Sequence, residues 1–320
     1  MTLKDMDLLK IHSVTKKILV SLVGAFLLVF LLFHATANLF VLRQDEGAWY
    51  SAFCHFMGTN WIVKIFEVVL MGAIAIHIVM TMWLAVANRR ARPQRYRQPQ
   101  RSVTHTTSKL MVWSGILILA CLILHFGDFY FVKLGWVKGE YMVETEKVQT
   151  PEMNQLVQFS AQMNMSPADL VSQMEAYADS GEVDPQSMAY LEDMREQLSL
   201  LQVLERAYSE GNVTADGKWI RHLTYDERQL LRELLPESDT EPDFYYMVRS
   251  KFQSLYLVVM YLLFFVVVFF HLRHAFPSAF QTLGLNNYKY NNLLEILGRL
   301  YTWMVVLAFA IVPILVYMGF

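Results

Sequence analysis

Four histidines lie inside strongly apolar stretches of the sequence, where a polar ring is unexpected: His34, His77, His125 and His271. An imidazole without a partner costs roughly several kcal/mol in hydrocarbon. Histidines in such places act as metal ligands, as proton carriers or as hydrogen-bonded structural groups. One buried histidine would fit the structural role, whereas four on separate apolar segments favour a functional one.

The apolar segments themselves are long enough to cross a bilayer. The chain has 320 residues, of which 55% are hydrophobic, and a mean hydropathy of +0.30. Soluble domains are less apolar than this. Five runs reach the roughly 20 residues that a membrane-spanning helix needs: 18–42, 61–87, 110–132, 253–276 and 300–319. We therefore predict an all-α membrane protein built on a five-transmembrane-helix bundle, and we expect no cleavable signal peptide.

Charges outside these runs are divided unevenly. Residues 89–109 contain six Arg and one Lys without an acid, whereas residues 138–243 contain 22 acidic and 8 basic residues, a net charge of −14. Because cytoplasmic loops are rich in Lys and Arg, we expect the basic link and the N-terminus inside and the acidic segment outside. A cytoplasmic anchor is preferred to nucleic-acid binding for the basic link.

The acidic segment divides the chain into three parts: helices one to three within 1–136, an acidic helical insert at 137–250 on the outer side, and helices four and five within 251–320. In the insert, Ser166 with Pro167 predicts a helix start. A second helix is expected from about 184 to Gly211, and a third is expected to stop at Pro236. The insert shows no catalytic motif, which leaves a solvated cap or a surface for partner docking.

The direction of each span pairs the histidines. Spans one and three run outward, and His34 and His125 lie toward their outer ends. Spans two and four run inward, and His77 and His271 lie about 16 and 18 residues below their outer ends, roughly 24–27 Å at 1.5 Å per residue. Two layers of two imidazoles each is the arrangement that two bis-histidine haems stacked across a membrane require.

Glycines accompany this pattern. Gly24 and Gly115 each precede a histidine by ten residues, about 15 Å along a helix, which is the level of the inner pair. Their missing side chains would let spans one and three approach a flat macrocycle. Simple close contact between helices is the alternative.

Other polar residues lie at the predicted inner surface. His271 and His274 compete for one ligand role, and we expect His271 because it lies deeper in the apolar run. Arg273 or His274 would then lie near the haem propionates. Arg89 and Arg90 could also meet propionates, or could extend toward lipid headgroups.

The ordered set of segments resembles the membrane-anchor cytochrome b subunit of succinate:quinone oxidoreductases, the succinate dehydrogenases and fumarate reductases, in its type with one anchor polypeptide and two haems. The resemblance covers 1–136 and 251–320, and its segments are "SLVGAFLLVFLLFHATANLF", "FEVVLMGAIAIHIVMTMWLA", "WSGILILACLILHFGDFYF" and "FHLRHAFPSAFQTLGLN". In the last segment the ligand histidine and the following glycine of the family match His271 and Gly284. The long outer insert departs from the family, whose link at this point is short.

The resemblance implies a subunit without a succinate site. It would anchor a flavoprotein subunit and an iron–sulfur subunit on the cytoplasmic face of a bacterial inner membrane. Two haem b groups would carry electrons to or from a quinone, with menaquinone expected. The inner haem, between His77 and His271, would be proximal to the iron–sulfur chain, and the outer haem, between His34 and His125, distal.

Glu67 is the acid considered for proton handling, because some members of the family have a similar glutamate. A hydrogen bond between helices is its alternative role. His55, in the predicted outer loop, is a weaker candidate, and His12, His105 and His222 are interpreted as surface residues.

Two other functions remain open. The chain could be the cytochrome b subunit of another quinone-linked enzyme, such as a hydrogenase or formate dehydrogenase. A proton-coupled transporter with a histidine relay would need acids among the imidazoles, for which Glu67 is the candidate.

Overall fold

The computed structural model describes residues 13–90, 106–180, 184–235, 240–285 and 287–320. The chain divides into two compact units. The first contains residues up to 126 together with those from 248 onward, and the second contains residues 127–247. Each unit is described by itself.

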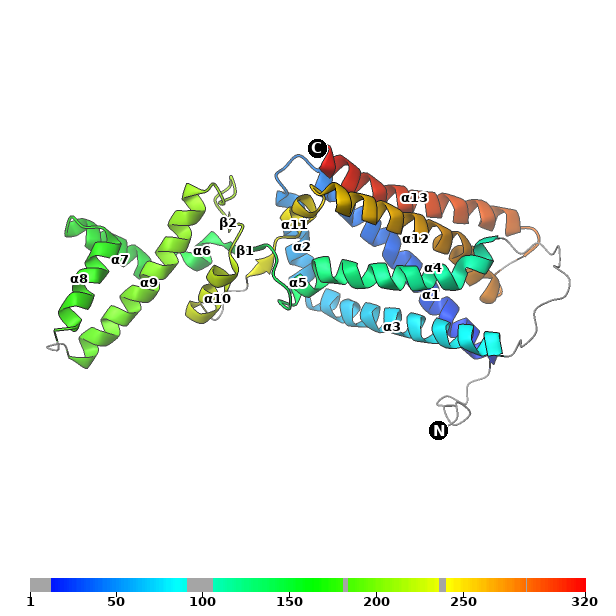
Figure 1. Cartoon of the computed structure of the whole chain (residues 1–320), viewed down its shortest axis with the longest axis horizontal. Coiled ribbons are helices and arrows are strands. Elements are labelled where there is room, and N and C mark those ends of the chain that lie inside the picture. The colour runs from blue at the N-terminus through cyan, green and yellow to red at the C-terminus, as the bar shows by residue number, and fades with distance from the viewer. Residues whose placement is uncertain (1–12, 91–105, 181–183, 236–239, 286) are drawn as a thin grey trace, which may run out of the picture. The chain divides into compact units, whose positions relative to one another are not determined.

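The first unit contains the five expected spans, which lie side by side as long helices (Figure 1). Within the described residues, five helices are long and apolar enough to cross a membrane, which confirms the prediction of a multi-pass, mainly helical membrane protein. They are α1 (Ser13–Leu39), α3 (Trp61–Arg90), α4 (Thr106–His125), α12 (Leu255–Thr282) and α13 (Asn291–Tyr317).

Packing inside this bundle centres on two helices. Helix α12 packs against α13, α4 and α1, and α1 also packs against α3 and α13. Large apolar side chains are exposed on the outward faces, among them Val29, Val68, Trp113 and Leu263. Such faces are stable where lipid hydrocarbon is the solvent.

Two spans are longer than their apolar runs. Helix α12 continues through Pro277 to Thr282. Proline is tolerated within membrane helices because neighbouring groups can satisfy the freed backbone groups. Gly284 then ends the helix with a φ of +74°, and the Leu285 amide donates to the carbonyl of Phe280. This left-handed position favours glycine. Helix α13 begins at Asn291, nine residues before the predicted start of its apolar run.

The third span changes its helical form near its end. Helix α4 ends at His125 and is followed by one π-helical turn, η2 (Phe126–Tyr130), and by α5 (Phe131–Lys133). The sequence predicted one uninterrupted run here. Single π-turns inside helices occur frequently at functional sites.

The connection between the first two spans is also helical. After the short helix η1 (Phe40–Leu42), helix α2 (Ala48–Thr59) begins behind Gly47, whose φ is +79°. His55 therefore lies on a helix, and its assignment to a loop was wrong. Helix α2 packs against α3 and η1. It is shorter than a membrane span, so a search for apolar runs of membrane length does not find it.

The second unit is helical with a small sheet. It contains α6 (Thr145–Val148), α7 (Pro151–Gln162), α8 (Pro167–Ala178), α9 (Pro185–Ser209) and α10 (Tyr225–Leu234), while α11 (Phe244–Lys251) leads back to the first unit. The strands β1 (Tyr141–Glu144), β2 (Trp219–Ile220) and β3 (Glu241–Pro242) pair antiparallel in the order β2-β1-β3.

The predicted helix limits that fall within the described residues of this unit are confirmed. Ser166 caps α8 by accepting from the Asp169 amide, with Pro167 in the first turn. Helix α9 ends before Gly211, which has a φ of +70°. Helix α10 ends at Leu234, and Pro236, the expected stop, lies outside the described residues.

Candidate cofactor site

The outer pair of histidines meets inside the first unit. His34 lies on α1 and His125 is the last residue of α4. Their ring centroids are 6.0 Å apart and the ring planes make an angle of 78°. Two residues that are 91 positions apart in the sequence are thus brought together.

This spacing suits two imidazoles on opposite sides of one metal. An imidazole nitrogen binds a transition metal at about 2.0–2.1 Å, and about 1.1 Å more leads to the ring centre, so two opposed rings have centroids about 6.2 Å apart. The observed 6.0 Å is close to this value. The outer pair could therefore supply the two protein ligands of one haem iron.

Aromatic rings surround the outer pair. The ring of Phe30 stacks on His34 with centroids 5.4 Å apart, and Phe309 approaches His34 at 5.6 Å. Tyr261 lies 6.3 Å from His125, edge to face. Flat apolar rings of this kind provide the walls that a planar macrocycle packs against.

A hydrogen-bonded chain leads from His34 toward helix α2. The Asn38 amide donates to the backbone carbonyl of His34 at 2.8 Å and lies 3.5 Å from its Nδ1. The Tyr50 hydroxyl donates to the Asn38 side-chain oxygen at 3.3 Å. Burial raises the pKa of Tyr50, and Cys54 adds to the rise, so this hydroxyl stays protonated and can donate.

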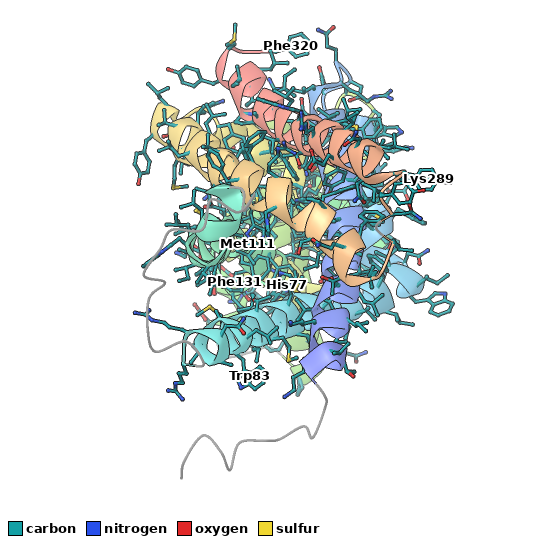
Figure 2. All side chains as sticks on the ribbon, turned by 90° about the vertical axis from the view of Figure 1, so that its right-hand side faces the viewer. His77, Trp83, Met111, Phe131, Lys289 and Phe320 are labelled. Carbon is teal, nitrogen blue, oxygen red and sulfur yellow. The ribbon has the colours of Figure 1, made fainter. Side chains whose placement is uncertain are left out.

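The inner pair consists of His77 on α3 and His271 on α12. Each ring faces a glycine on a neighbouring helix. A Cβ added to Gly24 would lie 3.8 Å from Cε1 of His77, and one added to Gly115 would lie 3.7 Å from Cε1 of His271. Figure 2, which looks along the bundle, shows His77 on the side of α3 that faces the other helices.

These glycine contacts also give the vertical spacing of the two pairs. Gly24 precedes His34 by ten residues on α1, and Gly115 precedes His125 by ten residues on α4. Ten helical residues rise about 15 Å. The inner pair therefore lies about one half of a membrane thickness from the outer pair on both helices.

The ring nitrogens of the inner pair differ in their partners. Nδ1 of His271 lies 3.1 Å from the Ser114 hydroxyl on α4. Nδ1 of His77 is buried and has no hydrogen-bond partner among the described residues. A buried polar atom with unused bonding capacity is unfavourable unless a bound group or water supplies a partner. Nδ1 of His77 is thus an atom at which a bound group or water is expected.

Several basic residues lie in the C-terminal parts of α3 and α12. Arg273 and His274 follow His271 on α12 within one turn, and both are partly buried. Arg89 and Arg90 are exposed in the last turn of α3. The remaining arginines of the basic link, with His12 and His105, lie outside the described residues.

The proton-handling candidates lie on two helices. Glu67 is partly buried on α3, ten residues before His77, and His55 is partly buried on α2. Asp128, on the π-helical turn, is a second acid within a span and was missed by the sequence reading. His222 was interpreted as a surface residue, but it is partly buried against Tyr246, with ring centroids 3.7 Å apart.

Sequence reasoning did not find the neighbours of the histidines. Ser114, Asn38 and Tyr50 carry no signal of their own, because single small polar residues are common in membrane helices. Across the described residues, no group of three or more His, Cys, Asp or Glu side chains is placed to hold a metal ion. A bis-histidine haem needs only two protein ligands per iron.

Comparison with known proteins identified no relative of the chain. No family model, no curated protein and no solved structure showed significant similarity to the chain.

Proposed function

We propose that the chain is a dihaem cytochrome b that anchors a succinate:quinone oxidoreductase in the membrane. The proposal rests on four spanning helices that each carry one histidine. The ring centroids of His34 and His125 lie 6.0 Å apart, and His77 and His271 each lie beside a glycine of a neighbouring helix. A structural role would not require the rings of His34 and His125 to lie this close together.

The chain's own residues would hold and orient the two cofactors. His34 and His125 would bind the outer haem, and His77 and His271 the inner one. Each haem, when bound, supplies a one-electron carrier. The glycines leave room at the inner level, and the aromatic rings exclude water at the outer level. Arg273 and His274, within one turn of His271 on α12, would contact the propionates of the inner haem.

The partners follow from the resemblance and from the charges. A flavoprotein and an iron–sulfur subunit would bind at the cytoplasmic end, where the basic residues lie. Electrons would pass between them and a quinone, with menaquinone as the expected species. The succinate site would belong to the flavoprotein, and the acidic unit would face the outside of a bacterial cytoplasmic membrane.

The test combines spectroscopy with single replacements. We expect the purified protein to show a b-type absorption band in a reduced-minus-oxidised spectrum, with two haems per chain. His34→Ala and His125→Ala should remove one spectral component, and His77→Ala and His271→Ala the other. His274→Ala is the matched control and should keep both haems.

Two results would contradict the proposal. Protein without any haem band would leave a proton-coupled transporter as the better interpretation. If one replacement in the outer pair and one in the inner pair removed the same spectral component, the assignment of the four histidines to these pairs would be wrong. Mass spectrometry of the co-purified complex would separate a succinate dehydrogenase from a hydrogenase or formate dehydrogenase.

A further inference from the structure

Ser114 occupies a special place beside the inner pair. It is buried on α4, with 6% of its surface exposed, and directly precedes Gly115. Its hydroxyl oxygen lies 3.1 Å from Nδ1 of His271 and 3.0 Å from the backbone carbonyl of Met111. Both distances are within hydrogen-bond range.

The Ser114 hydroxyl has a single proton, and this fixes which group donates in each of the two hydrogen bonds. A serine hydroxyl has one proton to donate and lone pairs that accept. The Met111 carbonyl can only accept, so it takes the hydroxyl proton. The bond to His271 therefore requires Nδ1 to carry the hydrogen and to donate it to the serine oxygen.

A neutral imidazole has one protonated nitrogen, so a hydrogen on Nδ1 leaves Nε2 with a free lone pair. Nε2 is then the nitrogen available to bind iron. The adjacent Gly115 leaves the Cε1 edge of the same ring open. Ser114 thus fixes the orientation of the His271 ring, and Gly115 leaves space beside that ring.

We infer that Ser114 is a positioning residue that holds His271 in the tautomer whose Nε2 is free to bind iron. The inference rests on the proposed function. A ligand that donates its second N–H to an acceptor becomes a stronger electron donor to the metal. Ser114 should therefore stabilise the ferric form of the inner haem.

The surroundings of His77 and His34 differ from those of His271. Nδ1 of His77 has no partner, and the contact of Asn38 with Nδ1 of His34 is longer, at 3.5 Å. The Asn38 amide nitrogen already donates to the carbonyl of His34. The effect of Ser114 should therefore be confined to one haem.

The experiment uses the full complex and a potentiometric titration of its b-type bands. Ser114→Ala should raise the midpoint potential of the haem that is lost in His271→Ala and leave the other potential unchanged. Ser114→Thr keeps the hydroxyl and should restore the original value. Thr302→Val is the matched control, because Thr302 is a fully buried hydroxyl that bonds to the carbonyl of Gly298.

Each outcome decides the inference. Loss of the inner haem alone in Ser114→Ala, with recovery in Ser114→Thr, would also support it. Unchanged potentials in a Ser114→Ala complex that binds two haems would overturn it, as would equal shifts in Ser114→Ala and Ser114→Thr. Wild-type protein without haem would instead refute the proposed function, so the two failures are distinguishable.

Discussion

At the scale of single residues, Glu67 offers the clearest test of proton handling. It lies on α3 ten residues before His77, about 15 Å along the helix and toward the level of the outer pair. A carboxyl group near a reacting quinone can take up or deliver a proton as electrons move. Gln keeps the size and hydrogen bonding of the side chain but cannot exchange a proton in this way.

We predict that Glu67→Gln keeps both haems and the assembled complex but lowers quinone-linked turnover about a hundredfold, the lower end of the range of about 10²–10⁴ for lost acid–base catalysis. Succinate oxidation by a dye that bypasses the membrane subunit should continue. Glu295→Gln is the control, because Glu295 pairs with Arg299 at an exposed position on α13. Equal loss of both activities would indicate a structural role, and unchanged quinone turnover would direct attention to His55.

The residue scale also shows what sequence can and cannot reveal. Each imidazole was identifiable because a polar ring in an apolar run is costly. Counting residues from the helix ends predicted the pair His34 and His125, whose rings meet in the structure, and the pairing of His77 with His271 stays a prediction. Ser114 was not identifiable in this way. A serine in a helix can satisfy itself on its own backbone, so its contact with His271 depends on how α4 and α12 pack.

At the scale of the elements, the contact of Gly24 with His77 allows a separate prediction. Gly24 on α1 faces His77, whereas Gly72 on α3 has nothing within 4 Å of an added Cβ. A large side chain at the first position would occupy the space beside the inner pair. The same side chain at the second position would extend into lipid.

We therefore expect Gly24→Leu to reduce the inner haem content severely and to leave the outer haem bound, with Gly72→Leu as the matched control. The measurement is haem stoichiometry and the two spectral components in purified protein. Equal loss of both haems in Gly24→Leu would indicate that the glycine serves general helix packing. Full retention of both haems would show that no cofactor lies against this face of α1.

The elements differ in how well sequence predicts them. The five spans and the capped helices of the second unit follow from long apolar runs and from capping residues such as Ser166 and Asp184. Strands of two to four residues are too short to show alternation, so the β2-β1-β3 sheet was not foreseen. Its pairing joins residues 143 and 220, which only the folded chain brings together.

The second unit has its own apolar interior, which is why an acidic sequence can fold there. Buried residues of β1, α9 and β2, such as Val143, Leu200 and Ile220, form one cluster, and a smaller cluster links α7, α8 and α9 around Leu156 and Met194. The acidic residues lie mainly on exposed faces of these helices. Charge and core thus occupy different sides of the same helices, as amphipathic periodicity requires.

At the scale of the whole molecule, the distribution of charge predicts its orientation. The segment 138–243 carries a net charge of −14, and the link 89–109 carries seven basic residues without an acid. Basic loops are retained on the cytoplasmic side, whereas acidic segments influence orientation little. The number of spans fixes the rest, because the link and the acidic segment are separated by one span and must lie on opposite sides.

We expect a protease added to intact spheroplasts to cut within 140–245 and to spare the link at 89–109. Opened membranes should be cut at both places, which controls for sites that are inaccessible to the enzyme. The opposite pattern in intact cells would invert the chain and exchange the inner and outer pairs. His77 and His271 would then lie far from the cytoplasmic partner subunits, and the proposed order of electron transfer would have to be reversed.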